Sequence, residues 1–134
     1  MNTLNNVKRL SLDLFDNKNG FIVPIEFSTL PFFPQRLYYI SGAVKPRGGH
    51  AHRTIEQILI CVHGCVRNTT YDGKSDMVTT LNEPNDGLYI PAGLWDEQEY
   101  ETQDSVLLVL ANKTYDSKDY IHDWKEFLNF RKEE

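Results

Sequence analysis

Cysteine is scarce in this sequence, which has two, Cys61 and Cys65, among 134 residues. Two cysteines are too few to build the disulfide framework of a small secreted protein. Their C-x-x-x-C spacing is neither that of a redox C-x-x-C pair nor half of a zinc ribbon. Because both lie in an apolar stretch, we expect buried free thiols and a cytoplasmic location.

Long apolar runs and excess positive charge are lacking as well. No segment approaches the roughly 20 apolar residues that cross a bilayer, and polar residues interrupt the N-terminal MNTLNNVKRL where a signal peptide would be apolar. The formal net charge of -5 argues against nucleic acid or an anionic membrane as a partner. The length suits one compact domain, residues 1–134.

Short segments that alternate apolar and polar residues predict an all-β protein with many strands. Residues 7–15 and 21–27 alternate in this way around DNKNG, which is typical of a β-hairpin with an Asn-Gly turn. Further strands are expected, between turn signals such as YDGK and PAG, at residues 35–45, 50–53, 56–64, 65–71, 76–81, 88–90, 94–100 and 104–113.

Only the tail has helical spacing. In SKDYIHDWKEFLNF, the apolar residues Ile121, Trp124 and Leu128 recur every three or four positions, and Ser117 is the candidate N-cap. We therefore expect one short C-terminal helix, on which His122 would be solvated.

The stretch PRGGHAHRTIEQ places two histidines one residue apart. On a strand, His50 and His52 point to the same face, and Gly48 and Gly49 before them leave room for a ligand to approach the backbone. An imidazole with a pKa of about 6.5 takes and gives protons near neutral pH. The pair could perform acid–base chemistry, bind a metal, or simply occupy a polar pocket.

The histidine pair stands in a wider pattern. A glycine-bearing turn, H-x-H and the downstream Gly64 resemble the first motif of the cupins, and GLYIPAG at residues 87–93 resembles a shortened second motif. The two motifs together cover about a third of the chain. The resemblance implies a cupin double-stranded β-helix, a jelly-roll-like barrel, carrying the short C-terminal helix.

Cupins that bind a metal usually use two histidines, a glutamate and a third histidine. Here the count back from Gly64 puts Gln57, rather than Glu56, at the glutamate position, and Asp96 stands at the third-histidine position. These two departures favour a site without a metal. Two histidines and Asp96 could still form a facial triad for iron.

A narrower resemblance rests on KPRGGHAH, GLYIPAGLWDEQEY and the tail SVLLVLANKTYDSKDYIHDWKEF. These blocks resemble the bacterial sugar nucleotide 3,4-ketoisomerases that act on dTDP-4-keto-6-deoxyglucose, from about residue 8 to residue 127. The resemblance implies that the C4 ketone of the sugar becomes a C3 ketone through an enediol, with no cofactor, in the biosynthesis of dTDP-3-amino-3,6-dideoxyhexoses for surface glycans. It also implies a homodimer, and it leaves open whether the product is galacto- or gluco-configured.

The same resemblance implies the roles of the site residues. His50 and His52 would be the catalytic pair, one serving carbon and the other oxygen. The residues expected to bind the substrate are Arg36, Tyr38, Arg47, Gln57 and Asp96.

Most of these residues also have a simpler interpretation. Arg47 offers a forked guanidinium to the sugar or diphosphate, but it could be a solvated loop residue. Tyr38 could serve core packing, and Asp96 could be a surface carboxylate. Trp95 should face away from the site, and His63 is expected to be an exposed hairpin residue.

Three other functions stay open at this point. A nucleotide-sugar 3,5-epimerase would also use a cupin barrel and a histidine base. A non-catalytic sugar-binding cupin would use the same pocket without turnover. A metal-dependent dioxygenase or isomerase would use the two histidines and Asp96 as ligands.

Overall fold

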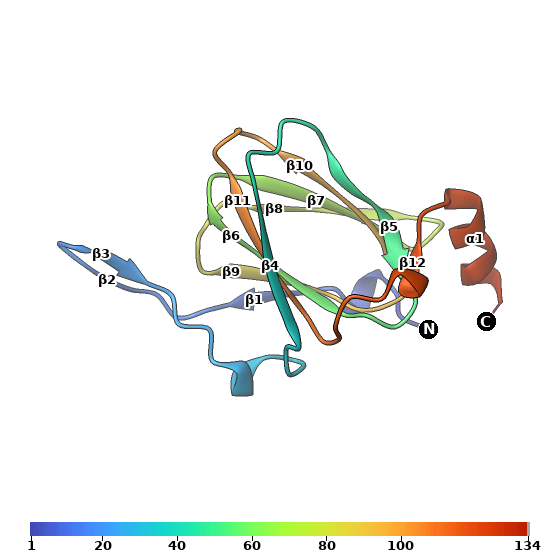
Figure 1. The fold of residues 1–134 in the computed structure, drawn as a ribbon, viewed down its shortest axis with the longest axis horizontal. Coiled ribbons are helices and arrows are strands. Elements are labelled where there is room, and N and C mark those ends of the chain that lie inside the picture. The colour runs from blue at the N-terminus through green and yellow to red at the C-terminus, as the bar shows by residue number, and fades with distance from the viewer. Residues whose placement is uncertain (134) are drawn as a thin grey trace.

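Two five-stranded antiparallel sheets face each other in the computed structural model, which describes residues 1–133 (Figure 1). The first sheet has the order β1 (Lys8–Ser11), β9 (Asp86–Ile90), β6 (Gln57–His63), β11 (Val106–Ala111) and β4 (Arg36–Ser41). The second has the order β12 (Tyr120–Ile121), β5 (Arg47–His52), β10 (Trp95–Tyr100), β7 (Val66–Tyr71) and β8 (Asp76–Leu81). The predicted all-β class is confirmed.

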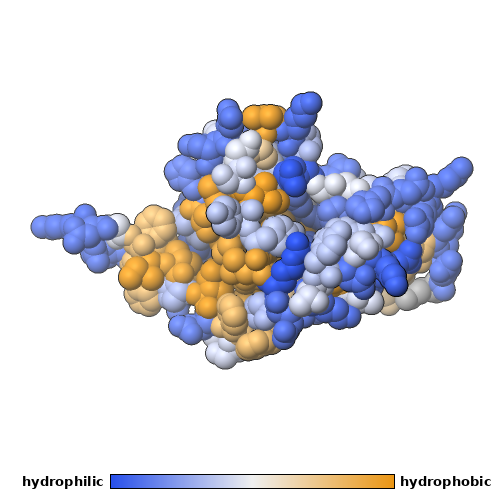
Figure 2. Space-filling view, viewed as in Figure 1, coloured by the Kyte–Doolittle hydropathy of each residue, from blue (hydrophilic) through white to orange (hydrophobic). Residues whose placement is uncertain are grey.

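The N-terminal hairpin is shorter than the sequence predicts. Only β2 (Phe15–Asn17) and β3 (Gly20–Ile22) pair with each other, whereas β1 pairs with β9 in the first sheet. The reason is burial, because Leu10 and Leu12 pack on the outer face of that sheet. The hairpin itself projects from the body (Figure 1), and hydrophobic side chains gather on this side of the molecule (Figure 2).

Strand β6 is buried on both faces, which explains its nearly continuous apolar sequence. Leu59 and Cys61 point into the core between the sheets. Ile58 and Ile60 point outward and are covered by the N-terminal segment. Alternation then turns Gln57 toward the interior, the same side as Leu59.

The outer face of the second sheet is covered by α1 (Trp124–Lys132). Phe127 is fully buried against Ala51, Trp95 and Ile121. Trp95 therefore serves packing, as its position on the strand predicts.

The predicted start of this helix is wrong. Asp123 is the N-cap, accepting a hydrogen bond from the Glu126 N–H at 2.9 Å, and Ser117 begins a separate 3₁₀ turn, η3 (Ser117–Asp119). Between them β12 pairs with β5, because strand pairing buries Ile121 completely. Two further 3₁₀ turns are η1 (Leu4–Asn6) and η2 (Phe27–Thr29).

Both cysteines are free thiols. Cys61 is buried, which raises its pKa to about 11, and Cys65 is half-buried. Among the helices of residues 1–133, we find none with the length and apolar character needed to span a membrane.

Candidate active site

Strand β5 aims the histidine pair at the interior. Ala51 is fully buried under α1 on the outer face of the sheet, so His50 and His52 point the opposite way, between the sheets. Their ring centroids lie 5.1 Å apart with the planes almost perpendicular.

A β-bulge precedes the pair. Asp96 pairs with His50 but Glu97 pairs with Gly48, so the register shifts by one residue. Gly48 has a φ of +86°, and a Cβ there would come within 2.8 Å of the Asp96 carbonyl oxygen. This glycine is therefore required for the close approach of β5 to β10.

One cavity of about 360 Å³ brings together most of the residues that the sequence singled out. Its lining includes five of these predicted residues, which are Arg36, Tyr38, Arg47, His50 and Gln57, and also Tyr120. The other two residues, His52 and Asp96, lie behind the cavity wall, with 5% and 2% of their surfaces exposed. The roles in binding and catalysis remain predictions.

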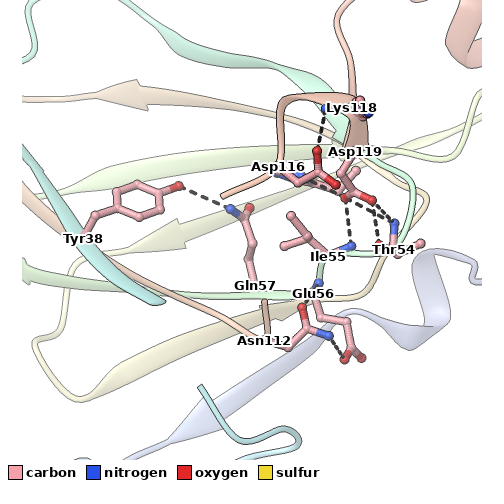
Figure 3. Close-up of polar contacts among 10 residues, drawn as sticks. Tyr38, Thr54, Ile55, Glu56, Gln57, Asn112, Asp116, Lys118 and Asp119 are labelled. Carbon is pink, nitrogen blue, oxygen red and sulfur yellow. Dashed lines mark hydrogen bonds and ion pairs between the residues drawn. The ribbon is translucent and has the colours of Figure 1, made fainter. Parts of the chain in front are cut away.

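Strand β4 contributes a polar wall to the cavity. The Gln57 amide donates a hydrogen bond to the Tyr38 hydroxyl at 3.2 Å (Figure 3), and the Arg36 guanidinium lies 4.5 Å over the Tyr38 ring. Burial raises the pKa of Tyr38, which keeps the phenol protonated. A phenol that accepts from Gln57 retains its own proton for a ligand oxygen.

Glu56 faces away from this cavity. Its carboxylate accepts hydrogen bonds from the Tyr89 hydroxyl and from the Asn112 amide, the latter at 2.9 Å. Of the adjacent pair, Gln57 is therefore the residue that reaches the site, as the count from Gly64 predicts.

The interpretation of Asp96 as a surface carboxylate is wrong. Its side chain is buried and accepts hydrogen bonds from the amides of Asn68, at 3.0 Å, and Gln98. Burial raises its pKa to about 6, against the effect of these two hydrogen bonds. Among the described residues, no group of three or more His, Cys, Asp or Glu side chains is placed to hold a metal ion.

The two histidines differ in their electrostatic surroundings. Burial, followed by the proximity of His50, lowers the pKa of His52 to about 4. Burial also lowers the pKa of His50, and the neighbouring His122 adds to this effect. Both imidazoles are therefore neutral at neutral pH and available as proton acceptors.

Three residues near the pair were missed as site residues by the sequence prediction: Asp119, Tyr120 and His122. The Tyr120 ring lies 4.9 Å from the His50 ring and 4.4 Å from the His52 ring, centroid to centroid. His122 is not on the helix. Its ring stacks on Tyr120, and its ring centroid lies 5.7 Å from that of His50. The signal available was the i, i+2 spacing of Tyr120 and His122 around the apolar Ile121, which is strand-like.

Two antiparallel sheets around a cavity with paired histidines define a small β-barrel with a candidate acid–base site. The family model described as FdtA: WxcM-like, C-terminal, matches residues 5–132. The chain is 35% identical over 119 residues to the TDP-4-oxo-6-deoxy-alpha-D-glucose-3,4-oxoisomerase of Aneurinibacillus thermoaerophilus, a match that covers 87% of this chain and 86% of the relative.

Solved structures give the same result. QdtA, a sugar 3,4-ketoisomerase of Thermoanaerobacterium thermosaccharolyticum crystallised with TDP, superposes with a TM-score of 0.93 at 35% identity, covering 98% of each chain. A mutant of the same enzyme in complex with TDP-4-keto-6-deoxyglucose gives a TM-score of 0.93 at 34% identity, over 98% of this chain and 97% of that one. The chain therefore belongs to the FdtA (WxcM-like, C-terminal) family, and the expected cupin-type fold is confirmed.

Proposed function

We propose that this protein is a dTDP-4-keto-6-deoxyglucose 3,4-ketoisomerase, which moves the sugar carbonyl from C4 to C3. The observation that carries the proposal is the placement of His50 in the wall of a cavity that also holds Arg36, Arg47 and Tyr38. The relatives support it, because they carry this activity in their names and one was crystallised with the same sugar nucleotide.

The reaction needs a base that is neutral at working pH. The proton on C3 is acidified by the neighbouring C4 carbonyl, and its removal followed by protonation of O4 gives an enediol. Return of a proton to C4, with loss of the O3 proton, gives the 3-ketone. His50 lines the cavity and has a lowered pKa, so it suits proton transfer at carbon.

The second proton must pass between the sugar oxygens. We assign this transfer to His52, whose ring lies edge-on to His50. The ring of Tyr120 packs against His52, so this ring contact has to open when the sugar enters. Tyr38, whose hydroxyl already accepts from Gln57, is placed to donate its own proton to a sugar oxygen.

The two arginines give the cavity its affinity for an anion. Arg36 and Arg47 come from β4 and β5, in different sheets, and both line the cavity. A guanidinium forms forked hydrogen bonds with phosphate oxygens. We therefore assign the diphosphate to the part of the cavity that Arg36 and Arg47 line.

Incubation with dTDP-4-keto-6-deoxyglucose in deuterium oxide, followed by NMR, tests the activity directly. We expect a new 3-keto species with deuterium at C4, the former carbonyl carbon. The same spectrum gives the configuration at C4. A 3,5-epimerase would incorporate deuterium at C3 and C5 and keep the 4-ketone. A non-catalytic binding protein would leave the sugar unlabelled.

Replacing either histidine should abolish most of the turnover. His50→Asn and His52→Asn are each expected to lower kcat by about 100-fold, the scale of losing a general acid or base. His63→Asn is the matched control, because His63 is exposed and pairs with Asp104 at 3.2 Å, outside the cavity lining. Full activity in both site variants would refute the assignment of the pair.

We also propose that the protein is a cytoplasmic homodimer. The free thiols Cys61 and Cys65 support the location. The hairpin supports the dimer, because Phe15, Phe21 and Ile22 are each more than half exposed and an isolated two-stranded hairpin is marginally stable in water.

Light scattering coupled to gel filtration tests the dimer. The double substitution Phe21→Ser and Ile22→Ser should convert it to monomer, because apolar surface of this kind is stable when a partner covers it. Val78→Ser on β8, at a residue that is 59% exposed, is the control and should leave the dimer intact. A hairpin variant that remains dimeric would contradict an interface at this position.

A further inference from the structure

The carboxylate of Asp119, at the end of η3, is fixed by hydrogen bonds from Thr54 and Ile55. The Thr54 hydroxyl donates to it at 2.6 Å and the Thr54 N–H at 3.0 Å, while the Ile55 N–H donates to the other oxygen at 3.0 Å (Figure 3). Burial opposes ionisation, but these hydrogen bonds outweigh it and lower the pKa of Asp119. A fixed negative charge therefore lies at the end of η3, held by donors from the loop between β5 and β6.

This charge faces His52. The oxygen of Asp119 that accepts from Ile55 lies 3.5 Å from Nδ1 of His52, and the two side chains are 7% and 6% exposed. The distance is within ion-pair reach but outside hydrogen-bond geometry, and both ring nitrogens of His52 are buried without a hydrogen-bond partner. Such an arrangement places the carboxylate beside an Nδ1 that no hydrogen-bond partner occupies.

A neutral imidazole has a proton on one nitrogen and a lone pair on the other. A lone pair on Nδ1 would face the carboxylate and be repelled, whereas an N–H at Nδ1 would point its positive end at the charge. We propose that Asp119 is a positioning residue that holds neutral His52 as the Nδ1–H tautomer, leaving the lone pair on Nε2.

This inference rests on the proposed function and deepens it. With Nδ1 protonated, Nε2 is the nitrogen of His52 that can accept a proton from a sugar oxygen. As His52 becomes charged during turnover, the carboxylate stabilises the imidazolium, as its effect on the pKa of His52 indicates. Burial alone would make that charge much less favourable.

Nitrogen-15 NMR of the full-length protein, labelled at histidine and measured without substrate at about pH 7.5, reads the tautomer directly. The His52 signals are identified as those that vanish in His52→Asn. We expect the chemical shifts and couplings of an Nδ1–H, Nε2-lone-pair imidazole. A wild-type His52 with its proton on Nε2 would overturn the proposal, whatever the enzyme activity.

Asp119→Asn sharpens the test. An asparagine that accepts from Thr54 through its carbonyl oxygen turns its amide toward Nδ1 and gives up the hydrogen bond from the Ile55 N–H. The tautomer of His52 should then invert to Nε2–H. We expect kcat to fall by about 10- to 100-fold, the scale found for carboxylates that orient metal-bound imidazoles, with little change in KM. Asp116→Asn is the control, because Asp116 caps η3 without contacting His52. An unchanged tautomer in Asp119→Asn would contradict the proposal.

If Asp119→Asn fails to fold, a second pair of variants tests whether Asp119 sets the tautomer of His52. Thr54→Val removes the hydroxyl that donates at 2.6 Å, and we expect a mixture of His52 tautomers with reduced kcat. Thr54→Ser keeps a hydroxyl, so it should show the Nδ1–H tautomer of His52 and a kcat close to that of wild type. Equal nitrogen-15 spectra of His52 in the two variants would contradict the role of Asp119 in setting the tautomer. Absence of ketoisomerase turnover in wild-type protein, with the Nδ1–H tautomer present, would instead refute the proposed function alone.

Discussion

His50 and His52 are chemically identical and stand two residues apart, yet the barrel gives them different surroundings. His50 borders the cavity and touches the exposed His122, whereas His52 is buried beside Asp119. The pKa of His52 is lowered to about 4, chiefly by burial. At the residue scale, the fold thus divides one motif into a cavity-lining base and a buried partner.

His122 should tune the pH dependence of the enzyme through His50. A charged His122 disfavours a second positive charge nearby, and it is the second cause, after burial, of the lowered pKa of His50. In His122→Gln this effect is lost, so the pKa of His50 rises. Because the base must be neutral, the acid limb of kcat/KM should move to higher pH, in a profile measured from about pH 5 to 8.

His63→Gln is the control for this profile, since His63 is outside the cavity lining and pairs with Asp104. An acid limb that stays in place in His122→Gln, or that moves to lower pH, would show that His122 does not act on the base in this way.

At the element scale, the bulge between β5 and β10 makes Gly48 much more sensitive to substitution than its neighbour Gly49. Gly48→Ala would place a Cβ 2.8 Å from the Asp96 carbonyl and 3.1 Å from the Glu97 Cα, both backbone atoms. The backbone must move, so we expect a loss of about 3 kcal/mol in the free energy of unfolding, measured in urea.

Gly49→Ala is the matched control for that loss. Gly49 also has a positive φ, of +76°, but a Cβ there would meet no atom within 4 Å. Only the conformational cost remains, about 1 kcal/mol. Equal losses in the two variants would show that the close approach at Gly48 carries no cost of its own.

The elements that the sequence predicts well are those whose own pattern determines their burial. Strand β8 spans Asp76–Leu81, as predicted from its alternation. In contrast, β12 is only two residues long and is held by pairing with β5, a non-local contact for which the i, i+2 spacing of Tyr120 and His122 is only a short local signal. Asp119 and Tyr120 were missed as site residues for the same reason.

The cavity could be predicted in larger part than the residues behind it. Arg36 and Tyr38 share a face by strand alternation, and so both reach the cavity. The buried Asp96 accepts hydrogen bonds from Gln98, two residues on along β10, and from Asn68 on β7, and its own sequence position does not indicate the contact with Asn68.

At the scale of the whole molecule, Asp96 and His52 oppose each other in the dependence of stability on pH. The folded-state pKa of His52 is lowered from 6.5 to about 4, so His52 costs stability as pH falls from 6.5 toward 4. The folded-state pKa of Asp96 is raised from 3.8 to about 6, so Asp96 costs stability as pH rises from 3.8 toward 6. Between about pH 4 and 6 the two effects largely cancel.

Removing one of the two groups should expose the other. In Asp96→Asn the carboxyl no longer titrates, so the free energy of unfolding should fall steeply as pH drops from about 6.5 to 4, through His52. Relative to wild type, the variant should gain about 3 kcal/mol between pH 4 and 7, the cost of ionising a carboxyl with this raised pKa. Urea unfolding at several pH values measures the difference, and Asp16→Asn on the exposed hairpin controls for the change in net charge. A constant difference between Asp96→Asn and wild type across this range would mean that the buried carboxyl ionises as easily in the folded chain as in the unfolded one.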